Sequence, residues 1–230
     1  MGERYYLELA AAAVRGTFIR NAGELPLCER LVSAPINELS PSELELVIRI
    51  GIERGVRLHH FKKSVRMLPR VHKVLGFLKG ISFNSLLDVG SGRGAFLFPF
   101  MQAFPYVSVQ ALDILEKRYE LLSDTALGGI ERLSVSMADI CSKPFADSSF
   151  DVVTMLEVLE HIPDVAAAIS AAVSIAGKYV VVTVPSAKDD NPEHIHLLTK
   201  ERLTELFLAA GAQRLSFDSV PGHLFMVAAV

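Results

Sequence analysis

The stretch that decides the fold of this chain is Leu86-Leu87-Asp88-Val89-Gly90-Ser91-Gly92-Arg93-Gly94. It begins with residues typical of a buried strand, and the serine and closely spaced glycines that follow are typical of a tight strand-to-helix turn. Glycine has no Cβ and tolerates positive φ, so such a turn can bring bare backbone against a ligand. The stretch therefore predicts a ligand-binding corner at the end of a buried strand.

Two later apolar runs each lead into an acidic residue. The run 107–112 ends at Asp113, and the run 133–137 is followed by Ala138 and Asp139. A carboxylate at the tip of the second strand can accept hydrogen bonds from both hydroxyls of a ribose, and one after the third strand suits an adenine amino group. A single acid of this kind is often a helix cap. Acids at three successive strands, with Asp88 in the first, favour a nucleoside site.

These motifs resemble those of the class I S-adenosylmethionine-dependent methyltransferases (types 11, 12 and 23) over about residues 68–230. The resemblance is carried by the glycine turn, Asp113, Ala138-Asp139, Phe150–His161 and Val181–Pro185. It implies that the glycine turn holds the methionine part of the cofactor, that Asp113 binds the ribose and that Asp139 meets the adenine. The cofactor-binding residues that it implies are Asp88, Gly90, Ser91, Gly92, Gly94, Asp113, Ile114, Ala138, Asp139, Ile140 and Glu157.

A dinucleotide-dependent dehydrogenase is the competing interpretation, because it uses the same kind of turn and a second-strand acid. Its fingerprint places a third glycine three residues after the second, where this chain has Ala95, and alanine is also allowed there. Asp88 and Asp139 are better explained by S-adenosylmethionine, which carries a sulfonium and an amino acid end where a dinucleotide carries a pyrophosphate.

From residue 86 onward, strand and helix patterns alternate, which predicts an α/β fold with a mainly parallel sheet covered on both faces. The strands are expected at 85–89, 107–112, 133–137, 150–156, 179–184, 213–218 and 224–229. Pro221-Gly222 predicts a hairpin-like turn, which makes the last strand antiparallel. The resemblance implies a Rossmann-like, doubly wound seven-stranded sheet of order 3-2-1-4-5-7-6.

Residues 1–67 are expected to form an N-terminal α-helical cap, and residues 68–230 the methyltransferase domain. A first helix is expected at Tyr5–Val14. Ser40-Pro41-Ser42-Glu43 is a capping box with proline at the first helical position, and it predicts a helix that runs to about Glu53. A further helix is expected from Pro69 to about Lys79.

The active site is expected in the loops 157–164 and 185–196, because open parallel sheets bind ligands at the carboxyl ends of their strands. Methyl transfer depends mainly on holding the nucleophile, the methyl carbon and the sulfur in line. The first candidate for acid or base work is His161, since the ordinary pKa of histidine lies near neutrality. His194 is the second catalytic candidate.

Glu157, Glu160, His161 and His194 form a candidate site for a divalent metal such as Mg, Mn or Fe, because one helical turn would bring Glu160 and His161 to the face of Glu157. The segment resembles the metal site of the small-RNA 3′-terminal 2′-O-methyltransferases, although Leu198 stands where that family has tryptophan. The same segment also recurs in metal-free class I methyltransferases of small molecules, where these histidines line the cofactor or acceptor pocket. Both interpretations stay open.

The segment from Arg54 to Leu87 carries eight Lys or Arg residues and no acidic residue, in a chain of 230 residues with a net charge of −3. Such a stretch can grip the phosphates of RNA, so RNA is a possible partner through residues 54–79. A solvated helix face that balances an acidic body, or a lid helix over the cofactor, explains the same charges.

Cys28 and Cys141 lie far apart and form no metal or redox spacing, which favours a reducing compartment. No apolar run approaches the roughly twenty residues of a membrane span, and the first residues lack the apolar region of a signal peptide. We therefore expect a cytoplasmic protein without membrane contact, a monomer or homodimer, that methylates an oxygen or nitrogen of a small molecule. The alternatives are a metal-dependent RNA 2′-O-methyltransferase and a cofactor-binding regulatory protein without turnover.

Overall fold

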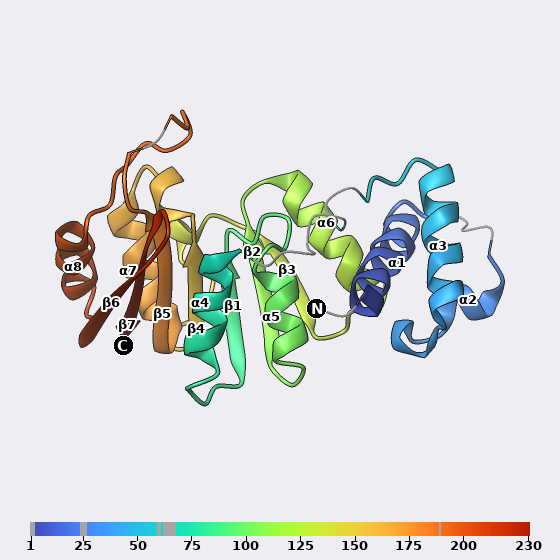
Figure 1. The fold of residues 1–230 in the computed structure, drawn as a ribbon, viewed down its shortest axis with the longest axis horizontal. Helices are drawn as coiled ribbons and strands as arrows, with labels where there is room; N and C mark the ends of the chain where they lie inside the picture. Colours follow the sequence, from blue (N-terminus) through green and yellow to red (C-terminus); the bar gives the residue numbers. More distant parts are fainter. Residues whose placement is uncertain (1–2, 24–26, 59–60, 62–67, 189) are drawn as a thin grey trace.

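A single mixed sheet organises the molecule, in a computed structural model that describes residues 3–23, 27–58, 61, 68–188 and 190–230. Seven strands follow one another in the order β3-β2-β1-β4-β5-β7-β6 (Figure 1). β7 runs antiparallel to both of its neighbours, β5 and β6, whereas the other pairs are parallel. The predicted strand order and the predicted antiparallel last strand are confirmed.

The strands begin and end close to their predicted positions. They are β1 (Ser85–Val89), β2 (Ser108–Asp113), β3 (Leu133–Met137), β4 (Phe150–Leu156), β5 (Ala176–Pro185), β6 (Arg214–Val220) and β7 (His223–Ala229). The largest difference is at β5, which begins at Ala176 rather than at residue 179. Its first residue already pairs with Phe150 of β4, and the register shifts between Phe150 and Val152.

Helices cover both faces of the sheet and enclose two apolar cores. One core lies under α4 (Pro69–Leu78), α5 (Leu97–Ala103) and α6 (Glu116–Leu127), and the other under α7 (Val165–Ile175) and α8 (Lys200–Ala209). Because side chains alternate along a strand, Leu86 of β1 lies in the first core and Leu87 in the second. β1 is thus buried on both sides, as a central strand of a covered parallel sheet should be.

The N-terminal helices extend the molecule beyond β3 instead of lying over the carboxyl ends of the strands (Figure 1). They are α1 (Glu3–Arg20), α2 (Glu29–Ser33), the short η1 (Ile36–Glu38) and α3 (Pro41–Glu53). α1 packs along α6, and it is longer than the predicted Tyr5–Val14 because its last turns also find partners there. Arg20 Nε lies 2.7 Å from Asp124 Oδ1. The capping box at the start of α3 is confirmed, with Ser40 Oγ accepting from the Glu43 N–H.

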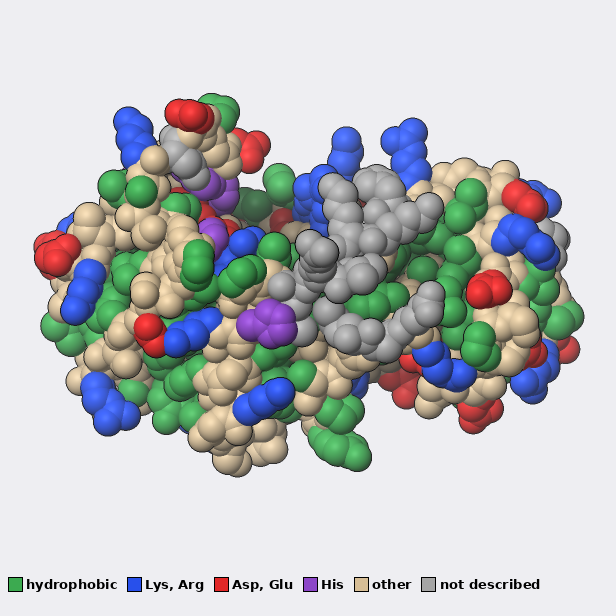
Figure 2. Space-filling view, viewed as in Figure 1, with side chains coloured by type: hydrophobic (Ala, Val, Ile, Leu, Met, Phe, Trp, Pro, Cys, Tyr) green, Lys and Arg blue, Asp and Glu red, His purple; other side chains and the backbone are tan. Residues whose placement is uncertain are grey.

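The basic segment 54–79 lies partly outside the described residues, which exclude 59–60 and 62–67. Lys73, on α4, pairs with Asp218 of β6. The described Lys and Arg side chains on the face in Figure 2 are scattered among acidic and apolar ones rather than gathered in one patch. Among the described helices, none has the length and apolar character to cross a membrane.

Candidate functional site

The glycine turn after β1 requires glycine for two separate reasons. Gly90, Gly92 and Gly94 all have positive φ, at 66°, 59° and 76°. A Cβ on Gly90 would lie 2.5 Å from Val158 Cγ2, and one on Gly94 would lie 2.4 Å from the ring of Phe98. The backbone therefore packs directly against neighbouring side chains in a conformation that other residues rarely adopt.

Asp113, at the tip of β2, ties this turn in place. Its Oδ2 accepts a hydrogen bond of 2.8 Å from the Gly92 N–H, and its Oδ1 accepts one of 2.9 Å from the Leu115 N–H. The Gly90 N–H donates to the carbonyl of Leu112 on the same strand at 2.7 Å. The turn is thus held by the second strand before any ligand is bound.

Asp88 lies beneath the turn, and its carboxyl group is buried in the sheet. Thr154 of β4 donates from Oγ1 to Asp88 Oδ1 at 2.7 Å, and Ser91 donates from Oγ to the Asp88 carbonyl at 2.8 Å. Burial raises the pKa of Asp88 to about 7, and the hydrogen bonds from Thr154 and Ser91 oppose this rise. Asp88 therefore connects the turn, through Ser91, with β4, through Thr154.

A cavity of about 640 Å³ opens at the carboxyl ends of β1 to β4, where the sequence places the ligand. The predicted cofactor residues that line it are Gly90, Gly92, Asp113, Ile114, Ala138, Asp139, Ile140 and Glu157. The other predicted residues, Asp88, Ser91 and Gly94, build the turn without lining the cavity. The described residues of segment 54–79 do not line it either, so the described part of this segment is no lid over the cavity.

Leu115 and Arg118 line the cavity but were not anticipated by the sequence analysis. Val158 and Glu193 also line it, and they lie within the predicted loops 157–164 and 185–196 without having been singled out as site residues. Arg118 is within reach of sequence reasoning, because it stands in the first turn of the helix that follows the second-strand acid. The loop that carries Glu193 was predicted, but which of its residues reaches the cavity depends on the path of that loop after β5.

Asp139 and Cys141 form the wall after β3. Asp139 Oδ1 accepts from the Cys141 N–H at 2.9 Å and so caps the short helix η3 (Ile140–Ser142). Burial, with a smaller contribution from Asp139, raises the pKa of the Cys141 thiol to about 11. The thiol therefore stays protonated at neutral pH, which argues against a nucleophilic role.

His161, in the short helix η4 (Leu159–His161), lines the cavity and has a defined ring orientation. Its Nδ1 lies 2.9 Å from the carbonyl oxygen of Glu193. A carbonyl only accepts, so Nδ1 carries the proton and Nε2 of the neutral ring is left with a lone pair. That nitrogen can accept a proton or bind a metal.

His194 lies beside His161 but lines a neighbouring cavity. The two rings are 4.8 Å apart in an edge-to-face arrangement. The second cavity, of about 240 Å³, also contacts Lys188 and His196. The carbonyl of Glu160 accepts hydrogen bonds from the Ile195 and His196 N–H groups, which attach this loop to η4.

Of the four metal-ligand candidates, the structure groups three. One ligand atom each of Glu160, His161 and His194 lies within 4.8 Å of the others. Glu157 stands apart from them, because residues 157–161 do not form the expected full helical turn and only Leu159–His161 are helical. Its Oε2 instead lies 2.9 Å from Nδ1 of His223, a residue that the sequence analysis did not single out.

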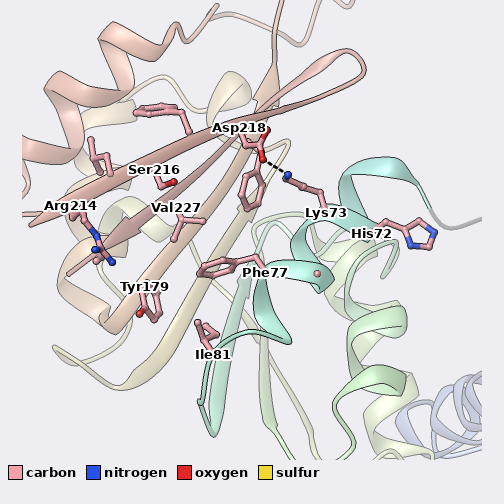
Figure 3. Close-up of a pocket in the computed structure, with 14 residues that line it drawn as sticks. His72, Lys73, Phe77, Ile81, Tyr179, Arg214, Ser216, Asp218 and Val227 are labelled. Atoms are coloured by element: carbon pink, nitrogen blue, oxygen red, sulfur yellow. Dashed lines mark hydrogen bonds and ion pairs between the residues drawn. The ribbon is translucent and has the colours of Figure 1, made fainter.

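A larger hollow, of about 820 Å³, lies between α4 and the face of β5, β7 and β6, away from the carboxyl ends of the strands (Figure 3). Phe77 of α4 meets Tyr179 of β5 at a ring distance of 5.6 Å, and Lys73 and Asp218 bridge its rim. None of the predicted site residues lines it. Size alone therefore does not identify the functional cavity.

Comparison with known proteins agrees with the geometry. Residues 87–177 match the family model described as a methyltransferase domain. The chain is 32% identical over 122 residues to 27-O-demethylrifamycin SV methyltransferase of Amycolatopsis mediterranei, which covers 48% of this chain and 43% of that protein. It is 30% identical over 111 residues to ribosomal RNA small subunit methyltransferase G of Dehalococcoides mccartyi, over 46% of this chain and 44% of that one.

Among solved structures, an S-adenosylmethionine-dependent methyltransferase from Aquifex aeolicus aligns with a TM-score of 0.56 at 19% identity, covering 75% of this chain and 98% of the other. At that identity the likeness concerns the fold. The chain spans less than half the length of these two curated relatives.

Proposed function

We propose that the protein transfers a methyl group from S-adenosylmethionine to a small molecule, because residues 87–177 match the model of a methyltransferase domain family and the whole sheet has the class I S-adenosylmethionine-dependent methyltransferase fold. An oxygen acceptor is the first candidate, and nitrogen the second. The observation that carries the proposal is the cavity whose walls are the glycine turn, Asp113 and Asp139.

The residues of this cavity fit the cofactor. Gly90 and Gly92 offer bare backbone to its methionine end. Each carboxylate oxygen of Asp113 already accepts one backbone N–H and can accept another hydrogen bond, which suits the two hydroxyls of a ribose. Ile114, Ala138 and Ile140 provide apolar contacts for the adenine, and the Asp139 carboxylate can accept from its amino group.

The bound cofactor supplies an electrophilic methyl group, and the chain's own task is to orient the acceptor and remove its proton. Nε2 of His161 is the candidate base that accepts this proton. Nδ1 donates to the Glu193 carbonyl, so the lone pair of Nε2 is free. The raised pKa of the Cys141 thiol argues against Cys141 as a nucleophile. The small-molecule preference is supported by the similarity to 27-O-demethylrifamycin SV methyltransferase.

The proposal is tested in two steps with the full chain. Titration calorimetry with S-adenosylhomocysteine should show binding, and Asp113→Asn should weaken it by roughly tenfold or more, since it replaces a charge-assisted hydrogen bond. Glu205→Gln, on the exposed face of α8, is the matched control. Absence of binding to the unaltered chain would reject the proposal.

The second step assays methyl transfer from S-adenosylmethionine to a panel of hydroxylated and amine compounds that includes 27-O-demethylrifamycin SV. Turnover that falls in His161→Ala while S-adenosylhomocysteine still binds supports the role of His161 as the base. Cofactor binding without transfer to any compound of the panel favours the alternative of a regulatory protein without turnover.

A second candidate function is divalent-metal-dependent 2′-O-methylation of RNA. It is favoured by the grouping of Glu160, His161 and His194, a carboxylate with two imidazoles, which is a ligand set suited to ions such as Mn or Fe. The similarity to ribosomal RNA small subunit methyltransferase G supports an RNA acceptor.

Metal analysis of the purified protein separates the two candidates. Under the second, the protein contains about one ion per chain, and Glu160→Ala or His194→Ala removes it. Methyl transfer to small molecules that persists after chelation rejects the second candidate and leaves the first in place.

A further inference from the structure

The strand β6 forms one edge of the sheet, and one side of its backbone is open. It pairs with β7, and among the described residues no strand lies along its other side (Figure 1). Alternate N–H and C=O groups of such a strand point away from the sheet and can pair with another chain. β6 is seven residues long, contains no proline and pairs with β7 without a register shift, so it lacks the devices that commonly block edge pairing.

The two faces of β6 carry different side chains. Arg214, Ser216 and Asp218 point to the face that carries α4, at the rim of the larger hollow (Figure 3). Leu215 and Phe217 point to the other face, where they are half-buried against the second apolar core. β6 therefore presents a charged row and an apolar row to a chain that pairs with its open side.

The charged row contains one cation and one anion, and the cation lacks a partner. Asp218 pairs with Lys73 of α4, and its Oδ1 accepts a hydrogen bond of 2.7 Å from the Ser219 N–H. Arg214 is exposed, and no side chain in the described part of the chain forms an ion pair with it. A carboxylate has about four acceptor sites, so Asp218 can accept a further guanidinium.

We propose that two copies of the chain form a dimer through antiparallel pairing of their β6 strands, centred on Ser216. A two-fold axis perpendicular to the sheet makes the strands antiparallel and keeps the charged rows on one face. With the axis at Ser216, Arg214 lies opposite Asp218 of the second copy, and Leu215 lies opposite its Phe217. Each pair occurs twice, because an isologous interface repeats every contact. The proposal does not depend on the function proposed above.

The charges select this register over its neighbours. An axis at Leu215 would place Arg214 opposite Ser216, and an axis at Phe217 would place it opposite Val220. Parallel pairing about an axis along the strands would put the two charged rows on opposite faces. Charges on an edge strand often prevent pairing, but opposite charges directly across two strands stabilise it. Ser216, which meets its own copy on the axis, is small and uncharged.

The first test measures association of the full chain. Sedimentation velocity over a series of protein concentrations should show a monomer–dimer equilibrium. Arg214→Asp places two carboxylates opposite each other at both ends of the interface and should raise the dimer Kd by roughly tenfold or more. Asp218→Arg should do the same with two guanidinium groups. The matched control is Arg49→Asp, which reverses an exposed charge of α3, far from β6 in Figure 1, and should leave the Kd unchanged.

The second test mixes the two weakened variants. Each has like charges across the axis on its own, whereas a mixed pair has a carboxylate opposite a guanidinium at both ends. The mixture should therefore form a heterodimer, and the double variant Arg214→Asp, Asp218→Arg should dimerise again. Circular dichroism verifies that each variant is folded, because Asp218→Arg also removes the partner of Lys73.

The third test locates the interface by hydrogen–deuterium exchange. Backbone amides of residues 214–220 that face away from β7 should exchange more slowly at high than at low concentration of the unaltered chain. In Arg214→Asp the same amides should exchange at one rate at both concentrations.

Four results would overturn the proposal. The unaltered chain would be a monomer at every concentration, which would leave the open edge to a different partner or to none. A dimer that both charge reversals leave intact would use another surface, as would protection confined to residues outside β6. Folded single variants whose mixture stays monomeric would reject the pairing of Arg214 with Asp218.

Discussion

Asp88, at the base of the glycine turn, couples the stability of the fold to pH. The glycine turn lies above its carboxyl group, Thr154 donates to it, and burial keeps its pKa near 7. In the unfolded chain the same group has its ordinary pKa of 3.8. Between these two values the folded chain holds a proton that the unfolded chain has lost, so stability falls as the pH rises through this window.

We predict that the ligand-free protein loses stability between about pH 4 and pH 7 through Asp88, and that Asp88→Asn removes this part of the loss. At about 1.4 kcal/mol per pKa unit, the contribution is at most about 4 kcal/mol. Urea unfolding of both proteins at pH 5 and pH 8 measures it, with the difference between the two pH values as the readout.

Thr154→Val gives the opposite control. It removes the donor that favours the charged form of Asp88, so its stability should fall more steeply with pH than that of the unaltered chain. An Asp88→Asn protein with the same pH dependence as the unaltered chain would show that Asp88 does not carry the effect.

At the scale of elements, the backbones of α1 and α6 approach each other closely. A Cβ on Gly128, at the end of α6, would lie 1.7 Å from the carbonyl oxygen of Ala12. A Cβ on Gly16 of α1 would meet the Asp124 carbonyl at 1.8 Å in the same interface. Glycines on both α1 and α6 therefore allow the N-terminal helices to pack closely against the methyltransferase fold.

We predict that Gly128→Ala lowers the free energy of unfolding by about 1–3 kcal/mol, because the helices must separate to admit the methyl group. Gly76→Ala is the matched control, since a Cβ at that position in α4 meets nothing within 4 Å. It should raise stability by up to about 1 kcal/mol through helix propensity. Chemical unfolding of the two variants decides the point, and equal effects would contradict the packing argument.

The sequence predicts the strands well because strong local signals coincide there. Apolar runs, glycine turns and acids mark β1 to β4, and Pro221-Gly222 marks the last hairpin. The contacts that the sequence does not predict are those between residues far apart in the chain. The contact of His223 with Glu157 depends on a hairpin register and on a positive φ at a residue that is not glycine, and no local pattern signals that φ.

The same limit applies to the second half of the site. His161 is recognisable from its place after the fourth strand, but its ring orientation is set by the carbonyl of Glu193, which lies 32 residues later. The grouping of Glu160 with His194 likewise depends on the path of the loop after β5. The sequence identifies which side chains can act in the site, whereas the partner that orients each of them is determined by tertiary packing.

At the scale of the whole molecule, the cavity is formed by the ends of strands that border both apolar cores. Its walls come from the ends of β1 to β4 and from the loops that follow them, so a ligand there contacts several elements at once. Binding should therefore stabilise the folded chain as a whole. In Figure 2 a hollow at the upper edge of the molecule, bordered by histidine side chains, marks the carboxyl-end side of the sheet.

We predict that S-adenosylhomocysteine at a hundred times its Kd adds about 2.7 kcal/mol to the free energy of unfolding. For a chain of this size that corresponds to a rise in Tm of about 5–11 °C. Differential scanning calorimetry with and without the ligand measures the rise. The Asp113→Asn protein, at the same ligand concentration, should show a smaller one, and an equal rise in both would contradict the assigned role of Asp113.

The two hydrogen bonds that Asp113 accepts from Gly92 and Leu115 restrict how the ligand preference of the site can evolve. One carboxylate serves both as a brace for the empty turn and as the proposed contact for the ribose. A substitution there cannot alter ligand preference without also altering the shape of the turn. A change of preference toward another nucleotide would therefore have to begin with substitutions at other residues. Arg118 is an example, because it lines the cavity but does not hold the turn in place.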